Sequence, residues 1–213
     1  MNLTVVVKSC QRDRDRGFHD AIRETWGKDL LALGGDLKFV VGGPGTTRTS
    51  DEINFADCPD EYLDLPQKTH RVCNWAYLKR WGHIFLCDND TLVNPVKLLS
   101  LPYRDFDYAG GFKGGELEIR KQFYYCDVHL GQQTLVYSWA SGGYGYFLSP
   151  KAQAVVGTTP PMIWAEDMYV GQVMGPLVDL KIAAFPMAKI TTHIPEKKNW
   201  SPEILRKWYN ESK

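Results

Sequence analysis

Two carboxylates stand at the end of an apolar run in the segment HIFLCDNDTLVNP, residues 83–95. Residues 84–87 have the composition of a buried strand, and Asp88 and Asp90 follow it directly. On an extended segment alternate side chains share a face, so both carboxylates can reach one ion while Asn89 points away. Carboxylate oxygens are ligands that Mg²⁺ and Mn²⁺ prefer. The spacing therefore fits a divalent cation site, and it also fits a polar turn in which Asp and Asn cap backbone groups.

The elements that would position these carboxylates alternate between strands and helices. Residues 2–7 are a β-branched apolar run typical of a buried strand, and residues 34–45 hold a second such run between glycines. Between them, residues 18–33 repeat apolar side chains at steps of four, which predicts a helix. Residues 67–82 predict another helix that leads into the strand at 83–87. Alternation of this kind implies an α/β fold with a mostly parallel sheet.

The carboxyl ends of parallel strands share one edge of a sheet, and ligands bind there in open α/β folds. We therefore expect Ser9, Gly42 and Asp88 to lie on one rim, with residues 8–16 forming a loop. The apolar faces expected for the two helices are Phe18, Ile22, Trp26 and Leu30 in the first and Val72, Trp75, Leu78 and Trp81 in the second.

The second half of the chain is aromatic and rich in glycine, which favours antiparallel strands. The segments concerned are 104–112, 122–130 and 143–149. Helices are expected at 165–175 and at 201–212, where Ser201 followed by Pro202 is a good helix start. We expect one domain over residues 1–213, in which two halves at about 1–95 and about 96–213 pack together.

Composition narrows the class of protein. Twenty-five basic and twenty-five acidic residues cancel, so no overall field attracts nucleic acid or a membrane surface. The five cysteines lack metal-ligand spacing and are odd in number, so we expect them to be reduced. The start at Met1 has no signal peptide, and no apolar run has the length of a membrane span. We expect a cytoplasmic protein.

Four further segments, together with DNDTLVN, resemble in order and spacing the motifs of the β-1,3-galactosyltransferase family, which includes N-acetylglucosaminyltransferases and Fringe-type enzymes. They are AIRETWG (21–27), DCPDEYLDLPQKT (57–69), SGGYGYFLS (141–149) and EDMYVG (166–171). The match runs from about Lys8 to His193. Because we expect no membrane anchor or stem like those of the Golgi members, the chain looks more like a viral or bacterial relative. A viral relative would be expected in the host cytoplasm.

The resemblance implies a GT-A (Rossmann-like) fold, a UDP-sugar donor, a glycan acceptor, a Mn²⁺ or Mg²⁺ ion and transfer with inversion. It also implies that the half at about 1–95 binds the nucleotide sugar and the half at about 96–213 binds the acceptor. The residues that match the family's metal site are Asp88, Asp90 and His193, with Asp90 as the direct ligand. Asp167 matches the catalytic base, which takes the proton of the attacking hydroxyl, and Glu166 is its close competitor.

Donor contacts are likewise implied by position. The residues concerned are Lys8, Ser9, Cys10, Arg12, Arg16, Lys68, Asn89, Gly142 and Gly143, besides the two aspartates of the metal motif. Arg23 matches a family position whose partner, carboxylate or phosphate, is undecided. Aromatic side chains that stack on sugars or belong to the core are Tyr108, Trp139, Tyr144 and Trp164.

The chain departs from the family at two places. Phe18 and His19 stand where a double arginine is usual, and Asn89 interrupts a run of aspartates. Two other classes of function stay open. In a haloacid-dehalogenase-like phosphatase, Asp88 would be the nucleophile. A non-catalytic sugar-binding module would use the aromatic side chains alone.

Overall fold

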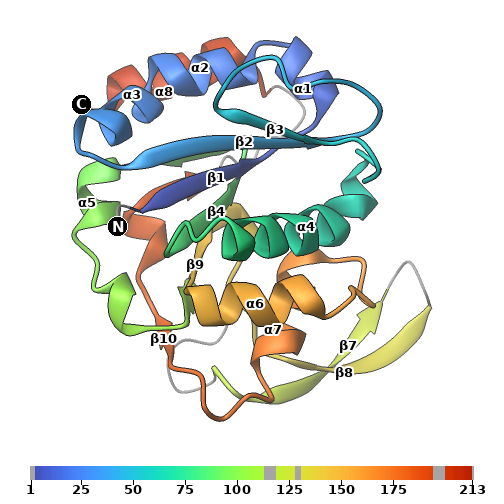
Figure 1. The fold of residues 1–213 in the computed structure, drawn as a ribbon. Helices are drawn as coiled ribbons and strands as arrows, with labels where there is room; N and C mark the ends of the chain where they lie inside the picture. The colour runs from blue at the N-terminus through green and yellow to red at the C-terminus, as the bar shows by residue number, and fades with distance from the viewer. Residues whose placement is uncertain (1–2, 113–118, 128–130, 194–199, 213) are drawn as a thin grey trace.

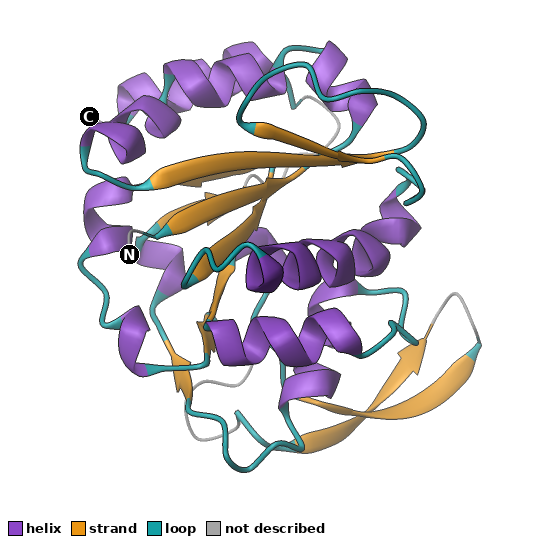
Figure 2. Ribbon diagram, viewed as in Figure 1, coloured by secondary structure: helices purple, strands orange, loops and turns teal. Residues whose placement is uncertain are grey.

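The computed structural model describes residues 3–112, 119–127, 131–193 and 200–212. A central sheet runs through the middle of the molecule and carries helices on both faces (Figures 1 and 2). Helices α2, α3 and α8 cover one face, and α4, α6 and α7 lie on the opposite side. The fold is thus the expected α/β arrangement, with a small antiparallel hairpin projecting from one end (Figure 2).

The strands of the chain fall into the central sheet and two short pairs. They are β1 (Thr4–Lys8), β2 (Asp36–Gly42), β3 (Glu52–Phe55), β4 (Ile84–Asp88), β5 (Thr91–Val93), β6 (Tyr108–Gly110), β7 (Gln122–Asp127), β8 (Gln132–Tyr137), β9 (Tyr146–Leu148), β10 (Ile182–Ala184) and β11 (Thr191–His193). The helices are α1 (Gln11–Asp15), α2 (Phe18–Glu24), α3 (Trp26–Ala32), α4 (Leu65–Leu78), α5 (Pro95–Leu99), α6 (Pro150–Thr158), α7 (Glu166–Met174) and α8 (Pro202–Glu211).

Within the described residues the central sheet has seven strands in the order β10-β6-β9-β4-β1-β2-β3. Strand β1 pairs in parallel with β2 and β4, and the register sets Lys8 opposite both Val40 and Asp88. The carboxyl ends of these strands therefore meet at one rim. Strand β9 is antiparallel to β4 and β6, and β5–β11 and β7–β8 form two separate antiparallel pairs.

The inner strands are apolar on both faces because both faces are covered. In β1, Val5 and Val7 join the core under α2, α3 and α8, whereas Val6 joins the core under α4, α6 and α7. Phe85 and Leu86 of β4 divide between the two cores in the same way. These strands can bear polar groups only where they leave the sheet, which places the first chemistry-bearing side chains at the rim.

The helix expected over 18–33 is divided into α2 and α3 at Thr25. The Thr25 backbone leaves the helical region, and its hydroxyl donates to the Ala21 carbonyl at 2.6 Å. A side chain on Gly27 would meet the Ile22 carbonyl oxygen at 2.6 Å, so the break brings the two helical pieces into close contact. The expected apolar face survives it, since Ile22 and Trp26 are fully buried.

The apolar face expected for α4 is confirmed at Val72 but wrong at Trp75 and Leu78. Trp75 and Leu78 are 39% and 70% exposed, whereas Val72, Cys73 and Ala76 are buried. Helix α4 packs both on the sheet and against α6. The residues that face these two neighbours are buried, and apart from Val72 they are not the large apolar residues from which the face was predicted. The loop expected over residues 8–16 is also partly wrong, since it contains α1.

The second half agrees with the sequence more closely. The three aromatic segments contain β6, β7 and β9, and the two helices expected there are α7 and α8. Ser201 caps α8 by accepting from the Ile204 amide. All five cysteines are free thiols. Of the helices in the described ranges, none combines the length and the apolarity that crossing a bilayer requires.

Candidate active site

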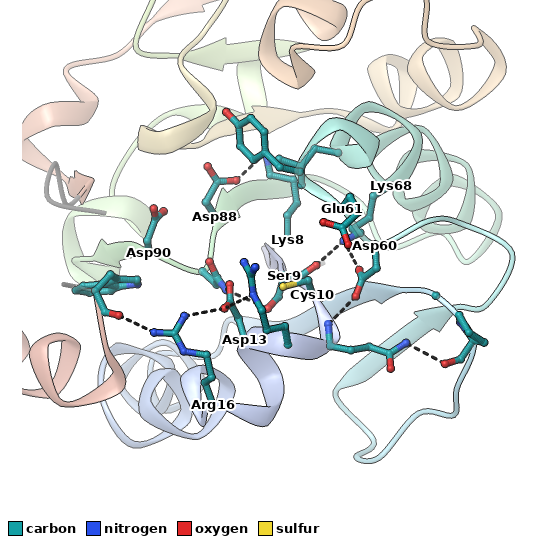
Figure 3. Close-up of a pocket in the computed structure, with 18 residues that line it drawn as sticks. Lys8, Ser9, Cys10, Asp13, Arg16, Asp60, Glu61, Lys68, Asp88 and Asp90 are labelled. Atoms are coloured by element: carbon teal, nitrogen blue, oxygen red, sulfur yellow. Dashed lines mark hydrogen bonds and ion pairs between the residues drawn. The ribbon is translucent and has the colours of Figure 1, made fainter. Parts of the chain in front are cut away.

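A pocket of about 590 Å³ opens at the rim where β1, β2 and β4 end. In Figure 3, Asp88 and Asp90 lie at one end, Asp60, Glu61 and Lys68 lie at the other, and Ser9, Cys10 and Asp13 lie between them. The predicted donor residues that line it are Lys8, Ser9, Cys10, Arg12, Arg16, Lys68, Asp88, Asn89 and Asp90. Gly142 and Gly143 do not line this pocket. The sequence thus identified much of its wall.

Lys8 reaches the rim as a buried cation. Its side chain is 1% exposed, and Nζ lies 3.2 Å from Asp88 Oδ1 and 2.8 Å from Glu166 Oε2. Burial opposes the charge, but the two carboxylates together raise the pKa of Lys8 above its usual value. Burial also raises the pKa of Asp88 to about 6, with Lys8 opposing the rise and the charges of Asp90 and Glu166 adding to it.

Asn89 does not point away from the site. Its amide donates to Ser9 Oγ at 3.2 Å and to Asp13 Oδ2 at 3.0 Å, which joins the end of β4 to the loop after β1. Burial would raise the pKa of Asp13, but the hydrogen bond from the Asn89 side chain and, after it, the charge of Arg12 lower that pKa. Asn89 therefore orders the pocket floor, and the reading of this side chain as pointing away was wrong.

A divalent cation fits the donor chemistry of this rim. Asp88 and Asp90 supply two carboxylates that line the same pocket. Mg²⁺ is often held by one or two carboxylates together with substrate phosphates. The backbone of His193 pairs with that of Thr91, directly after Asp90, while the His193 side chain lies outside what the structure describes. Among the described side chains there is no group of three His, Cys, Asp or Glu that could hold a metal.

The two carboxylates at the start of α7 have different surroundings. Glu166 is ion-paired with Lys8 and accepts from Thr69 Oγ1 at 2.8 Å and from the Tyr146 hydroxyl. Asp167 is half-buried and accepts from two backbone amides, those of Gly142 at 3.1 Å and Met168 at 2.9 Å. Burial, followed by the charge of Glu166, raises the pKa of Asp167. Of the two, Asp167 is the carboxylate better able to accept a further proton donor.

The turn Gly142–Tyr144 links the segments predicted to carry the chemistry. The Gly142 amide donates to Asp167, and the Gly143 carbonyl accepts from Thr91 Oγ1 at 2.9 Å. The Tyr144 carbonyl accepts from Thr191 Oγ1 at 2.8 Å. One turn therefore bonds to the start of α7, to β5 after the aspartate motif and to β11, which ends at His193.

Lys68 is a structural cation in this state of the protein. Its Nζ donates to the Ser9 carbonyl at 2.5 Å and to Asp60 Oδ1 at 2.7 Å. The Asp60 carboxylate also accepts from the amides of Gln11 at 2.6 Å and Gly42 at 2.7 Å. Asp60 and Lys68 thus fasten the ends of β1 and β2 to α4 on one side of the pocket.

The departure at Phe18 and His19 and the undecided partner of Arg23 both have structural answers. His19 is buried and stacks on Phe39 with 4.3 Å between ring centroids, so it belongs to the core. Arg23 pairs with the carboxylate of Asp51 at 2.8 Å rather than with a phosphate site. Phe18 is also buried.

The aromatic side chains considered as sugar platforms divide into two groups. Tyr108 and Trp139 are buried in the core, and the Tyr108 hydroxyl accepts from the Ala140 amide at 2.8 Å. Tyr144 and Trp164 are half-buried. A sugar-stacking role for Tyr108 or Trp139 is therefore wrong for the structure as described.

Sequence reasoning missed several residues of the pocket. Asp60 and Tyr62 lie inside the motif at 57–69, from which only Lys68 had been singled out. Asp13 lies among alternating charges that give no signal of their own. Trp200 lines the pocket and holds Arg16 through its carbonyl oxygen at 2.9 Å, and it lies beyond the last matched motif.

Similarity to known proteins is found in sequence and in fold. No model of a known protein family matches the chain. Human β-1,3-galactosyltransferase 5 is 27% identical over 177 residues, which are 71% of this chain and 56% of that protein. The chain therefore spans little more than half the length of that relative.

A crystal structure of a glycosyltransferase involved in the glycosylation of the major capsid of PBCV-1 superimposes with a TM-score of 0.50 and 10% identity, over 99% of this chain and 100% of that one. A197 from STIV is more distant, with a TM-score of 0.44, 9% identity and coverage of 87% and 82%, and adds no support. The sequence match is a similarity to a galactosyltransferase, and the first structural match shows a shared fold. The predicted resemblance and fold class are confirmed at that level.

Proposed function

We propose that the protein is a metal-dependent, inverting glycosyltransferase that moves a sugar from a UDP-sugar to a hydroxyl group of a glycan acceptor. The observation that carries the proposal is the convergence of Asp88 and Asp90 on a pocket at the strand ends. The turn at Gly142 ties the same rim to Asp167. The similarity to a galactosyltransferase supports the sugar-nucleotide donor.

The proposed metal ligands are Asp88, Asp90 and His193, with the diphosphate and water completing the shell. A bound Mn²⁺ or Mg²⁺ ion would neutralise charge on the departing diphosphate. Arg16 is held in the pocket by Asp13 at 3.2 Å and supplies a further cation for phosphate. Arg12, 77% exposed, extends over the same opening.

The reaction is a single displacement. The acceptor oxygen forms a bond to the anomeric carbon while the bond from that carbon to the diphosphate breaks, and nucleoside diphosphate leaves on the opposite face. Asp167 receives the proton of the acceptor hydroxyl. The raised pKa of Asp167 improves its match to that role, because a stronger base takes the proton more readily.

Isothermal titration tests the donor half of the proposal. UDP is titrated with Mn²⁺ and again with a chelator, followed by UDP-galactose, UDP-glucose, UDP-rhamnose and UDP-N-acetylglucosamine. We expect binding that requires the metal and is lost in Asp90→Ala. The matched control is Asp57→Ala, because Asp57 is a 67% exposed carboxylate paired with Arg71 outside the pocket. Equal UDP binding with and without metal would contradict the metal's role.

UDP release tests the catalytic half. Release of UDP from the preferred donor, with water or a glycan as acceptor, should be lost in Asp167→Ala while UDP still binds with Mn²⁺. Full-rate release by that variant would remove Asp167 from its role. The alternative functions give different results in the same assays. A phosphatase would cleave a simple phosphate ester without a nucleotide, and a sugar-binding module would bind glycan equally well in chelator.

A further inference from the structure

A buried charged network lies behind the donor pocket and reaches both halves of the site. Four of its members come from elements that are far apart in the chain: Lys8 from β1, Asp88 from β4, Glu166 from α7 and Thr69 from α4. Tyr146 of β9 completes it. Lys8 and Glu166 are both nearly inaccessible to solvent. The sequence suggested a nucleotide contact for Lys8 and a competing catalytic base in Glu166. Neither role explains why both side chains are buried.

Lys8 is committed to two carboxylates. The register of β1 with β4 places it directly opposite Asp88, and its ammonium group lies between Asp88 and Glu166. An ammonium group at 1% exposure that serves two carboxylates has little freedom to follow a diffusible phosphate. Its direct effect is to hold the Asp88 side chain in place.

Glu166 is equally committed. One oxygen accepts from Thr69 and from the Tyr146 hydroxyl, and the other is ion-paired with Lys8. A carboxylate whose two oxygens are engaged by three groups has little freedom to move. A fixed Glu166 at the first position of α7 also fixes the backbone that carries Asp167.

The contacts of Gly142 extend this constraint to the proposed base. A side chain on Gly142 would lie 3.0 Å from Glu166 Oε2 and 3.4 Å from Asp167 Cβ, so the turn is pressed against both residues. The Gly142 amide then donates to Asp167 Oδ2. Glu166 therefore sets the position of the turn that orients Asp167.

We propose that Lys8 and Glu166 are a buried pair of positioning residues, which hold Asp88 on the donor side and Asp167 on the acceptor side without contacting either substrate. The inference rests on the proposed function for the roles of Asp88 and Asp167. It assigns to Glu166 no proton transfer and to Lys8 no nucleotide contact. It also makes the two halves of the site one mechanical unit.

The test compares Glu166→Gln with Glu52→Gln. Glu52 is a matched control because its side chain is also nearly inaccessible, at 1% exposure against 5% for Glu166, is ion-paired with Arg14 at 2.9 Å and does not line the pocket. We expect Glu166→Gln to lower kcat for UDP release about tenfold or more, since a small misplacement of a reacting group has effects of that order. The Kd for UDP with Mn²⁺ should stay within about threefold of wild type, as expected for a group that touches no donor atom.

Two results would overturn the proposal. One is a kcat no lower than that of Glu52→Gln. The other is a Kd for UDP with Mn²⁺ that rises as much as kcat falls, which would make Glu166 part of the donor site. The pairing itself is tested by Lys8→Met and by the double variant with Glu166→Gln. We expect kcat of the double variant to match the worse single variant, because paired residues are not additive. Additive losses would contradict the pair.

Hydrogen exchange at the Gly142 amide separates this inference from the proposed function. That amide is bonded to Asp167, and we expect Glu166→Gln to accelerate its exchange about tenfold relative to Glu52→Gln. Unchanged exchange would overturn the positioning role whether or not the protein is an enzyme. Failure of wild-type protein to bind UDP would defeat the proposed function alone. If Lys8→Met does not fold, the Glu166→Gln kinetics and the exchange measurement still decide the question.

Discussion

Acid should destabilise this protein through His19 before it affects most carboxylates. Burial, the largest cause, and the nearby charges of Arg23 and Arg14 lower the pKa of His19 from 6.5 to about 4. Nδ1 lies 3.6 Å from Glu52 Oε2, which would favour protonation, but Arg14 already neutralises Glu52 at 2.9 Å. Burial therefore prevails, and the pKa of His19 stays low in the folded protein. The folded protein keeps His19 neutral where the unfolded chain would protonate it.

The sign and size follow from linkage. Above pH 6.5 neither state protonates His19, so it has no effect on stability. As the pH falls from 6.5 toward 4, only the unfolded state gains a proton, and the free energy of unfolding decreases by about 1.4 kcal/mol per pH unit. The loss is ~2 kcal/mol at pH 5 and levels off at ~3 kcal/mol below the folded-state pKa.

Urea unfolding followed by tryptophan fluorescence at pH 7.5 and pH 5 measures this loss. The variant His19→Phe keeps an aromatic ring on Phe39 and removes the titration, and His19→Gln guards against a size effect. We expect both variants to lose ~2 kcal/mol less than wild type between the two pH values. If wild type and both variants lose stability equally, His19 does not titrate as its burial requires and the reasoning fails.

The remaining predictions concern the proposed site. The variant Gly142→Ala should fold, with a free energy of unfolding in urea about 1 kcal/mol lower than that of wild type, because the added methyl group forces only small shifts. The same variant should lower kcat for UDP release about tenfold, because the methyl group presses on Glu166 and Asp167. The rate of UDP release should fall with acid at a pH above the usual 3.8 of an aspartate, because the base acts only when deprotonated and its pKa is raised. A pH–rate profile measures this limb, and an acid limb at or below pH 3.8 would count against Asp167 as the base.

Much of the site could be located from the sequence because its positions follow from local rules. An apolar run buried on both faces can carry carboxylates only where it leaves the sheet, so the sequence alone predicts that Asp88 and Asp90 lie at the rim, where the pocket is found. The alternation of strands and helices is also a local pattern, and it predicts the parallel sheet. Motif order added the resemblance that the comparisons support.

Side-chain partners could not be found in this way. Lys68 and Glu166 are ionisable residues in matched motifs, Lys8 stands where the match begins, and the resemblance implied contacts with substrate for all three. Their actual partners depend on strand register and on helix packing, as the pairing of Lys8 with Asp88 and Glu166 shows. The exposure of Trp75 on α4 could not be predicted for a similar reason, because the packing of α4 against the sheet and α6 determines which of its residues are buried.

The sequence by itself determined where polar groups emerge from the sheet, because burial and periodicity act over a few residues. Only the tertiary structure decided which of those groups remain available to a ligand. A charge that leaves water must find an opposite charge or several hydrogen bonds, and those partners come from distant parts of the chain. The fold therefore holds Lys8 and Glu166 in the interior and leaves Asp90 and Arg16 at the pocket wall.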